Sequence, residues 1–481
     1  MHLGKTAVVL GGSAAGLCTA GALAPYFEEV LVLERDELPA QAEHRRGVPQ
    51  SKHPHFLLNS GRRAIGALFP RFEADLIAAG GLHLMPSMDA AYLDGEGWSA
   101  RKRSAMTMVY GSRILIERVL RDKVRELPNV TIREGVTVNA LSTHSQRVTG
   151  VGFDDEEKIA DFVVDAMGRG SSVSSWLVAA GWPEPEVRTL DAKVTYTSRW
   201  YELPADRPEA WWWQHLVIMP TPDKGKHPDE HDFLVNFFPI EGNRAIACMG
   251  SWGLDMPRTT DAFVEAARRV RTPLFSTAMD RCSPTSEVHL TRSTGNKWRR
   301  YDRWRTPPEG LVFIGDSICA FNPFYGQGIS SAAISALLLR EHLSRTTSLE
   351  PRFYSRFLAA QRKALNVPWR LAMARDQGYE CAVGTEKPPE WRRRIIAAVS
   401  GPAFSFIVGA AREDPVVDEH FAKVFNLDES LGDMMTNPRV IAGLLRYRIR
   451  TALGRHRVPF GFDPQVDPPA TDYSPAAAAV R

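Results

Sequence analysis

The sequence predicts an α/β fold, which becomes α+β when the whole chain is counted. The first 34 residues follow the order strand, glycine-rich turn, helix and strand. Residues 190–255 alternate along the chain and are rich in β-branched and aromatic side chains, which is typical of an antiparallel sheet with one packed face. Residues 351–456 repeat their apolar positions at helical spacing. The chain should therefore combine a parallel sheet, a separate β layer and a helical C-terminal region.

The N-terminal unit is the most informative stretch. Residues 6–10 form a short apolar run, as in a buried parallel strand, and a glycine-rich turn follows it. Residues 17–24 then indicate a helix that Pro25 closes. Residues 29–34 indicate a second strand, which ends on the acid Glu34. This βαβ arrangement within about 30 residues is typical of Rossmann-like dinucleotide-binding domains.

The later elements are assigned from the same patterns. Residues 40–62 are polar and contain several Pro and Gly, so we expect a long loop. Apolar spacing predicts helices over 62–80, 113–127 and 328–343. Short apolar runs predict strands at 130–132, 136–141, 148–153, 162–165 and 311–314.

A chain of 481 residues suggests two or three domains. We expect a discontinuous Rossmann-like domain (1–185 plus 285–345), an antiparallel β substrate-binding domain (186–284), a C-terminal helical region (346–457) and a flexible tail (458–481). The net charge of +3 gives no strong field that would attract nucleic acid or a membrane. Five scattered cysteines and no recognisable signal peptide suggest a reduced, cytoplasmic setting. No run of about 18 apolar residues is seen, so no integral membrane segment is expected.

The first motif is Gly11-x-Ser13-x-x-Gly16. In a dinucleotide fold the first glycine makes the tight turn, the second position lets the backbone approach a diphosphate, and the third lets the helix pack on the strand. Ser13 is small and its hydroxyl could bond a phosphate oxygen. Glu34 lies 18 residues after Gly16, near the place of an acid that holds ribose hydroxyls. Such an acid disfavours a 2′-phosphate, so this site fits FAD or NAD better than NADP.

Two further segments follow predicted strands. The first holds Asp165 and Gly168 in a turn of small residues, which alone is a weak signal. The second runs from Gly315 and Asp316 to Gly328. There an acid could accept hydrogen bonds from ribose or ribityl hydroxyls, and glycines at a helix start let backbone approach a flat ligand. That helix N-terminus could stabilise negative charge on a reduced isoalloxazine, which favours FAD over NAD.

Taken in this order, the three segments resemble the single-component FAD-dependent monooxygenases of the aromatic-hydroxylase and squalene-epoxidase type over roughly residues 5–345. Arg113 matches that family's flavin-contacting arginine. Residues 47–58 and 322–328, with Pro368, Trp369 and Asp376, resemble bacterial natural-product oxygenases, including polyether-type polyene epoxidases. The expected cofactor-binding residues are Gly11, Ser13, Ala14, Ala15, Gly16, Glu34, Arg35, Arg113, Val138, Asp165, Gly168, Gly315, Asp316, Pro323, Gly326, Gln327 and Gly328.

The resemblance implies a reaction. Reduced FAD would react with O₂ to give a C4a-hydroperoxide, and one oxygen atom would pass to a hydrophobic natural-product-like substrate, by epoxidation of an alkene or hydroxylation of an electron-rich ring. The electrons would come from transiently bound NAD(P)H or from a separate flavin reductase. No catalytic side chain is assigned, although His53 and Tyr325 could contribute to the pocket. Two alternatives stay open: a flavin-dependent reductase of isoprenoid double bonds, and a non-catalytic FAD-binding redox protein.

Other features have an ordinary structural explanation beside a functional one. His53 and His55 could contact flavin or substrate, or pack as loop histidines, with equal weight. Arg45 and Arg46 could bond flavin or phosphate, but solvated side chains are slightly favoured for both. The run 211–213 of three tryptophans is expected in the β-layer core, and it lacks the Trp-x-Trp-x-Ile-Pro form of tryptophan halogenases, which disfavours halogenation. The cluster at 227–232 is expected to be a loop and not a metal site. Residues 446–455 form a basic amphipathic helix, which could touch a membrane or an acidic carrier domain, although a solvated charged face is favoured.

Overall fold

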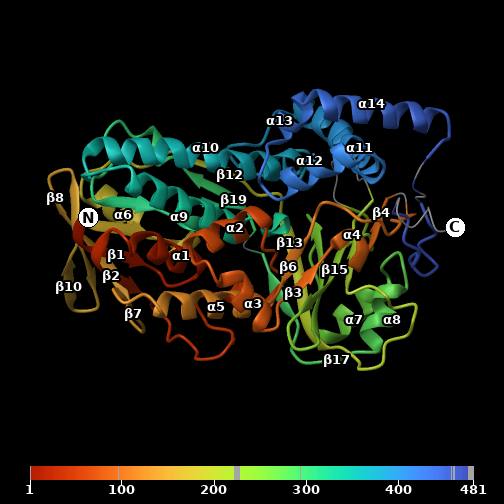
Figure 1. Ribbon diagram of the computed structural model, residues 1–481, viewed down its shortest axis with the longest axis horizontal. Coiled ribbons are helices and arrows are strands. Elements are labelled where there is room, and N and C mark those ends of the chain that lie inside the picture. The colour runs from red at the N-terminus through yellow and green to blue at the C-terminus, as the bar shows by residue number, and fades with distance from the viewer. Residues whose placement is uncertain are drawn as a thin grey trace.

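A computed structural model of the chain describes residues 2–95, 97–221, 228–292, 294–456, 458 and 461–474. A five-stranded sheet has the order β20-β11-β1-β2-β7, with every neighbouring pair parallel. Its strands are β1 (Gly4–Leu10), β2 (Phe27–Leu33), β7 (Val130–Arg133), β11 (Phe162–Asp165) and β20 (Leu311–Phe313). The mixed helix and sheet architecture confirms the predicted fold class (Figure 1).

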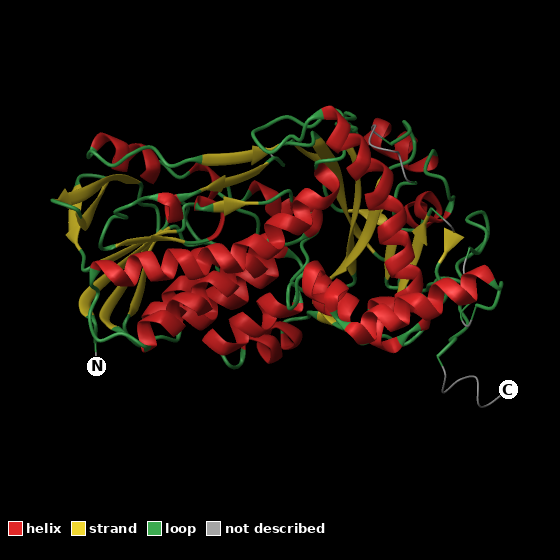
Figure 2. Cartoon of the chain, turned by 90° about the horizontal axis from the view of Figure 1, so that it is seen from above, coloured by secondary structure: helices red, strands yellow, loops and turns green. Residues whose placement is uncertain are grey.

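The two faces of this sheet pack against different layers. Ala7 and Val9 of β1 lie in a core shared with helices, whereas Val8 and Leu10 face a second core. The helices on the first face come together in one layer (Figure 2). They are α1 (Ala14–Leu23), α2 (Asn59–Leu68), α3 (Phe72–Ala78), α5 (Arg113–Arg125) and α9 (Gly328–Ser344). The second face packs against β8 (Val138–His144), β9 (Arg147–Phe153) and α6 (Val173–Ala179), and β10 (Glu156–Ile159) pairs with β9.

A large mixed sheet forms the second layer of the molecule. Its order is β17-β13-β16-β15-β14-β4-β5, and β18 also pairs with β13. The strands are β4 (Ala90–Asp94), β5 (Gly97–Trp98), β13 (Val194–Glu202), β14 (His215–Ile218), β15 (Leu234–Ile240), β16 (Arg244–Trp252), β17 (Ser283–Pro284) and β18 (His289–Thr291). Two helices, α7 (Thr260–Arg268) and α8 (Leu274–Asp280), pack on one face through Phe263 and Phe275.

This sheet differs from the expected antiparallel layer in two ways. The strands β4 and β5 come from the stretch assigned to the Rossmann-like domain, and β14 pairs with β4 in parallel. Their short length gave no strand signal in the sequence. The sheet is thereby built from both parts of the chain. The tryptophans at 211–213 do belong to its core region, where Trp211 and Trp213 are buried.

Smaller elements join these layers. Strands β12 (Val187–Leu190), β19 (Asn296–Arg299) and β21 (Cys319–Ala320) form a three-stranded sheet, and β3 (Leu82–Leu84) pairs with β6 (Met108–Tyr110). The short helical turns are α4 (Pro86–Asp89), η1 (Pro49–Lys52), η2 (Gly168–Gly170), η3 (Tyr301–Arg303), η4 (Gly315–Ser317) and η5 (Pro323–Tyr325). The stretch 40–62, expected to be one loop, thus contains η1 and the start of α2.

The C-terminal region is helical as predicted. It consists of α10 (Pro351–Asp376), α11 (Glu390–Glu413), α12 (Pro415–Phe425), α13 (Leu431–Thr436) and α14 (Pro438–Ala452). By length and composition α11 could cross a bilayer, although it contains no strictly apolar run of about 18 residues, and 17% of its apolar window is buried. Residues 461–474 differ from the expected flexible tail, because Phe462 pairs with Trp98 and the Tyr473 amide donates to the Arg101 carbonyl at 2.9 Å.

Candidate functional site

The glycine-rich turn between β1 and α1 has the close approaches that its motif predicts. Gly11 has φ +100°, and a Cβ there would lie 2.7 Å from the Ala166 carbonyl oxygen. A Cβ on Gly16 would lie 1.8 Å from the Gly11 carbonyl oxygen. Larger residues at either position would therefore push the turn apart. Ala14 opens α1, so the free backbone N–H groups of that helix point out of the turn.

Glu34 lies directly after β2, beside this turn. Its carboxylate accepts hydrogen bonds from the backbone N–H groups of Gly12 at 2.7 Å and Asp36 at 3.0 Å. The side chain is buried, and it is fixed at the carboxyl edge of the sheet. An acid held there suits the binding of a ligand's vicinal hydroxyls. The neighbouring Arg35 instead points outward, with 67% of its side chain exposed.

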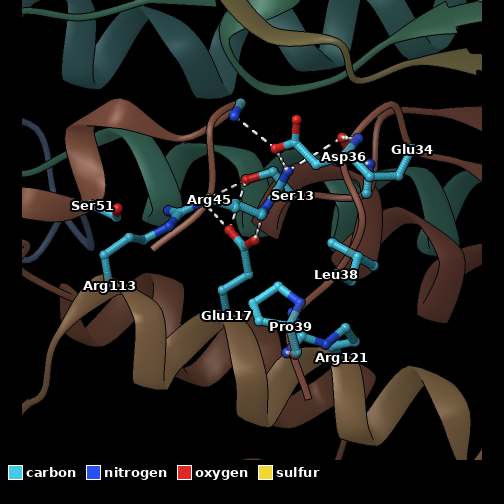
Figure 3. A network of polar contacts seen from close by, with 12 residues as sticks. Ser13, Glu34, Asp36, Leu38, Pro39, Arg45, Ser51, Arg113, Glu117 and Arg121 are labelled. Carbon is cyan, nitrogen blue, oxygen red and sulfur yellow. Dashed lines mark hydrogen bonds and ion pairs between the residues drawn. The ribbon is translucent and has the colours of Figure 1, made fainter. Parts of the chain in front are cut away.

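A buried ionic network surrounds the turn (Figure 3). Arg45 Nε donates to Glu117 Oε1 at 2.7 Å, and its NH1 donates to Asp36 Oδ2 at 2.8 Å and lies 3.2 Å from Glu34 Oε1. Only 6% of the Arg45 side chain is exposed. The expectation that Arg45 is solvated is therefore wrong, because three carboxylates compensate its burial; Arg46 is exposed.

Ser13 and Arg113 belong to the same network. Ser13 Oγ donates to Glu117 Oε2 at 2.9 Å, and Arg113 NH2 donates to Ser13 Oγ at 2.7 Å and to Glu117 Oε2 at 3.0 Å. The hydroxyl proton of Ser13 is thus donated to Glu117 in a hydrogen bond. Burial raises the pKa of Glu117, but the charges of Arg113 and Arg45 outweigh it and the net shift is downward, so this carboxyl is ionised. The sequence did not single out Glu117; its only signal was the i, i+4 spacing from Arg113 on α5.

The second motif shapes a turn next to the first. Asp165 is fully buried at the end of β11, where it accepts hydrogen bonds from Ser171 Oγ at 2.6 Å and the Met167 N–H at 3.1 Å. Burial raises the pKa of Asp165 to about 6, against those hydrogen bonds. Gly168 has φ +77°. In this structure Asp165 organises its own turn and does not face outward.

The third motif meets the first at the carboxyl ends of the strands. Gly315 has φ +73°, and a Cβ there would lie 2.8 Å from the Ala15 Cβ. Asp316 follows and is half-buried. Burial raises the pKa of Asp316, while the charges of Arg169 and Arg113 oppose that shift. The close contact of Gly315 with Ala15 places these two motifs at one edge of the sheet.

The loop that leads into α9 carries an unpaired amide. Gln327 precedes Gly328 at the start of α9 and is 1% exposed, yet neither of its side-chain amide atoms has a hydrogen-bond partner among the described residues. Leaving a buried amide unpaired costs about 1–3 kcal/mol, so a ligand that pairs it would be favoured. Gly326 has φ +64° and packs on Phe56, where a Cβ would lie 2.9 Å from the Phe56 Cβ. Pro323 is exposed.

Asp376 on α10 holds this loop from behind. Its Oδ1 accepts from Trp252 Nε1 at 3.3 Å and Tyr325 OH at 3.0 Å, and its Oδ2 accepts from the Asn296 and Asn322 amides, each at 3.0 Å. Burial raises the pKa of Asp376 against these four donors. The Tyr325 hydroxyl therefore donates its hydrogen bond to Asp376. We call these five residues the Asp376 cluster.

The remaining predicted residues lie around the edge of the site. His53 is buried, and its Nδ1 lies 2.8 Å from Ser198 Oγ on β13. Burial lowers the pKa of His53 to about 3, and that of His55 to about 4, so both are neutral at pH 7. Val138 begins β8, two residues after Val136, whose N–H donates to the Glu34 carbonyl at 3.0 Å. His227 lies outside the described residues, and no metal-binding cluster occurs within them.

Comparison with known proteins decides the family. No family model matches the chain. Protein Rv3254 of Mycobacterium tuberculosis is 30% identical over 469 residues, which cover 94% of this chain and 95% of that protein. Among solved structures, the flavin-dependent brominase Bmp2 has a TM-score of 0.65 at 13% identity, covering 94% of this chain and all of its own. PqsL of Pseudomonas aeruginosa, described as a probable FAD-dependent monooxygenase, has a TM-score of 0.58 at 16% identity over 82% of this chain and 99% of its own.

The chain belongs to the same family as Protein Rv3254, and its fold is the one found in structures described as a flavin-dependent brominase and a probable FAD-dependent monooxygenase. Within this FAD-dependent monooxygenase-like fold, the three motifs meet at the carboxyl edge of the parallel sheet, and the β layer lies beside them (Figure 1). Brominase and monooxygenase structures share this fold, so the fold itself does not separate oxygenation from halogenation.

Proposed function

We propose that this protein binds FAD and acts as a monooxygenase that inserts one oxygen atom from O₂ into a hydrophobic, natural-product-like substrate. The observation that carries the proposal is the meeting of Gly315 with Ala15, which joins the starts of α1 and α9 at one edge of the sheet. Two helix N-termini there would hold a diphosphate and an electron-rich ring.

The residues present fit FAD. Glu34 is fixed by two backbone N–H groups at the position of a ribose-binding acid. Gln327 offers a buried amide without a partner among the described residues, and Arg113 Nε is likewise unpaired. Asp316 lies where it could accept hydrogen bonds from hydroxyls of the cofactor. To bond a phosphate oxygen, the Ser13 hydroxyl would turn its proton from Glu117 to the phosphate and donate there.

An aromatic cluster lies beside the loop that contains Gly326. Phe56, which packs on Gly326, contacts Tyr110, His215 and Phe238, with ring centroids 5.0–6.0 Å apart. Burial lowers the pKa of His215 to about 4, so this ring is neutral at pH 7. A neutral aromatic wall supports a hydrophobic substrate, with epoxidation of an alkene and hydroxylation of an electron-rich ring both compatible with it.

Within this proposal the protein supplies binding, orientation and exclusion of water. Bound FAD, reduced by NAD(P)H or by a separate reductase, supplies the activation of O₂. The Asp376 cluster fixes the 322–328 loop against the β layer. It would thereby hold the bound cofactor in a constant position relative to the aromatic side chains around Phe56. The packed aromatic rings keep water from the same place.

The test uses the full-length protein reconstituted with FAD. The flavin released by heating is first identified by chromatography, and FAD affinity is measured by fluorescence. The reduced holoenzyme is then incubated with a panel of polyenes and phenols under ¹⁸O₂. The proposal expects a product that contains one ¹⁸O atom. Product formation under strict anaerobiosis would instead assign a reductase of double bonds, and protein that never retains FAD would refute the cofactor assignment.

A further inference from the structure

The C-terminal helices leave a large apolar surface uncovered. Among the described residues, eleven of the sixteen exposed large apolar side chains lie between positions 391 and 453. Such a concentration is unusual for a soluble monomer and marks an interaction surface. We call it the C-terminal face, and its main members are Trp391, Ile395 and Val399 on α11 and Ile441, Leu445, Ile449 and Leu453 on or just after α14, all 40–66% exposed.

The spacing of these residues shows that each helix presents one continuous stripe. They recur every four positions, so they lie on one side of their helix. The opposite sides are packed: Val440, Leu444 and Tyr447 of α14 belong to a buried cluster with Ala410 of α11. The stripes are therefore the outward faces of helices that already have a core. In Figure 1, α14 lies at the outer edge of the molecule, with α11 beneath it.

Positive charge accompanies the stripes. Helix α14 contains four arginines and no acidic residue. Arg446 and Arg450 pair with Asp414 and Glu413, whereas Arg439 and Arg448 form no ion pair with any described residue and are exposed. On α11, the exposed Arg392 and Arg394 follow Trp391, and Arg394 pairs with Glu390. The C-terminal face thus combines apolar stripes, arginines and an edge tryptophan, which is the pattern of helices that lie in the interface of an anionic membrane.

The geometry argues against two other interpretations of the C-terminal face: contact with a second copy of the chain, and a membrane-spanning α11. A second copy docked on the same face would bring the arginines of α14 against their own counterparts. Helix α11 is apolar enough to cross a bilayer, but its C-terminal half packs on Tyr447, and Arg393 near its start donates to the Gly378 carbonyl oxygen and pairs with Glu380. These contacts hold it on the rest of the protein, so it would lie on a membrane and not span it.

We propose that the C-terminal face binds the surface of an anionic lipid membrane, with the stripes of α11 and α14 in the headgroup layer. The inference does not depend on the proposed oxygenase activity, because the residues that carry it are separate from the candidate site. It favours membrane contact over a merely solvated face for the basic helix at residues 446–455. It also stays consistent with the absence of a clear integral membrane segment.

The test is co-sedimentation of the full-length protein with vesicles of phosphatidylcholine alone or of phosphatidylcholine mixed with phosphatidylglycerol. Binding should be at least tenfold stronger to the anionic vesicles and should weaken as salt is raised. The double variant Leu445→Glu/Ile449→Glu should lower that binding at least tenfold, and Arg439→Glu/Arg448→Glu should abolish the preference for phosphatidylglycerol. Ile159→Glu, at a still more exposed apolar position on β10, is the control and should bind as the unmodified protein does.

Circular dichroism and thermal midpoints of every variant establish that the fold is kept. The proposal is overturned if the unmodified protein ignores both vesicles, binds both equally, or loses binding equally with Ile159→Glu. Sedimentation velocity distinguishes membrane binding from dimerisation through the C-terminal face. A dimer that Leu445→Glu/Ile449→Glu converts to a monomer, without vesicle binding by either form, would assign the C-terminal face to a second copy of this chain.

Discussion

Replacing Asp376 should destabilise the protein and weaken FAD binding together. Asp376 is fully buried and accepts four hydrogen bonds, from Trp252, Asn296, Asn322 and Tyr325. Asp376→Ala leaves all four donors without their acceptor in a site that water reaches poorly. Asp376→Asn keeps one oxygen, but its NH₂ group faces two of the donors.

The magnitude follows from the number of donors. A hydrogen bond to a charged group is worth about 1.5–3 kcal/mol, and a buried donor left unpaired costs about 1–3 kcal/mol. Partial relaxation and entry of water reduce these values, so we expect Asp376→Ala to lower the free energy of unfolding by about 4 kcal/mol or more. Asp376→Asn should cost about half as much, because two of the four hydrogen bonds survive.

The assay is urea unfolding of the apo protein followed by circular dichroism, paired with an FAD fluorescence titration. Asp261→Ala, which removes an exposed acid from α7, is the control and should change stability by less than about 0.5 kcal/mol. Asn322 and Tyr325 lie in the loop that leads to Gln327, so FAD affinity should fall in the same order as stability. An Asp376→Ala protein within about 1 kcal/mol of the unmodified chain would refute the reasoning.

Three further predictions follow from the same site. Gly16→Ala should abolish FAD binding, because its Cβ would lie 1.8 Å from the Gly11 carbonyl oxygen; normal cofactor retention after gel filtration would contradict this. Arg45→Met should cost about 3–5 kcal/mol, since it removes the cation that three neighbouring carboxylates share, and a denaturation midpoint equal to that of the unmodified protein would count against it. Burial lowers the pKa of His53 to about 3 and that of His215 to about 4, below the ordinary 6.5. The unfolded chain therefore takes up protons first, and stability that is full above pH 6.5 should fall by up to about 1.4 kcal/mol per pH unit for each histidine as the pH drops toward those values. Differential scanning calorimetry at pH 7.5 and 5.0 measures this, and His215→Gln should flatten the dependence.

The parts of the site that the sequence could predict are those built from adjacent elements. Gly11, Gly16 and Glu34 were identifiable because a strand, a turn and a strand end follow one another within one βαβ unit. Gly315 could be added because the carboxyl ends of parallel strands share one edge of a sheet. No such rule points to Glu117, which lies 104 residues from the Ser13 that it accepts from.

The same limit explains the other omissions. Asp376 resembled a feature of one subgroup, but its role depends on donors that three other segments bring to it. The burial of Arg45 could not be foreseen either, because its partners Asp36 and Glu117 meet only in the folded chain. Strand β4 joins the large sheet through a partner more than a hundred residues away. Long-range pairing, and not local propensity, decided all of these features.

The Asp376 cluster changes how the C-terminal helices should be regarded. One carboxylate on α10 joins the candidate flavin loop through Asn322 and Tyr325, and the β layer through Trp252 of β16. A cofactor that orders the loop would therefore also stabilise α10, since linked elements share the free energy of ligand binding. It follows that removing residues after 345 would not leave an intact FAD domain, because three buried amide and hydroxyl donors and the Trp252 indole would lose their common acceptor. The helical region is thus part of the site's construction, and its exposed outer face is free for another role.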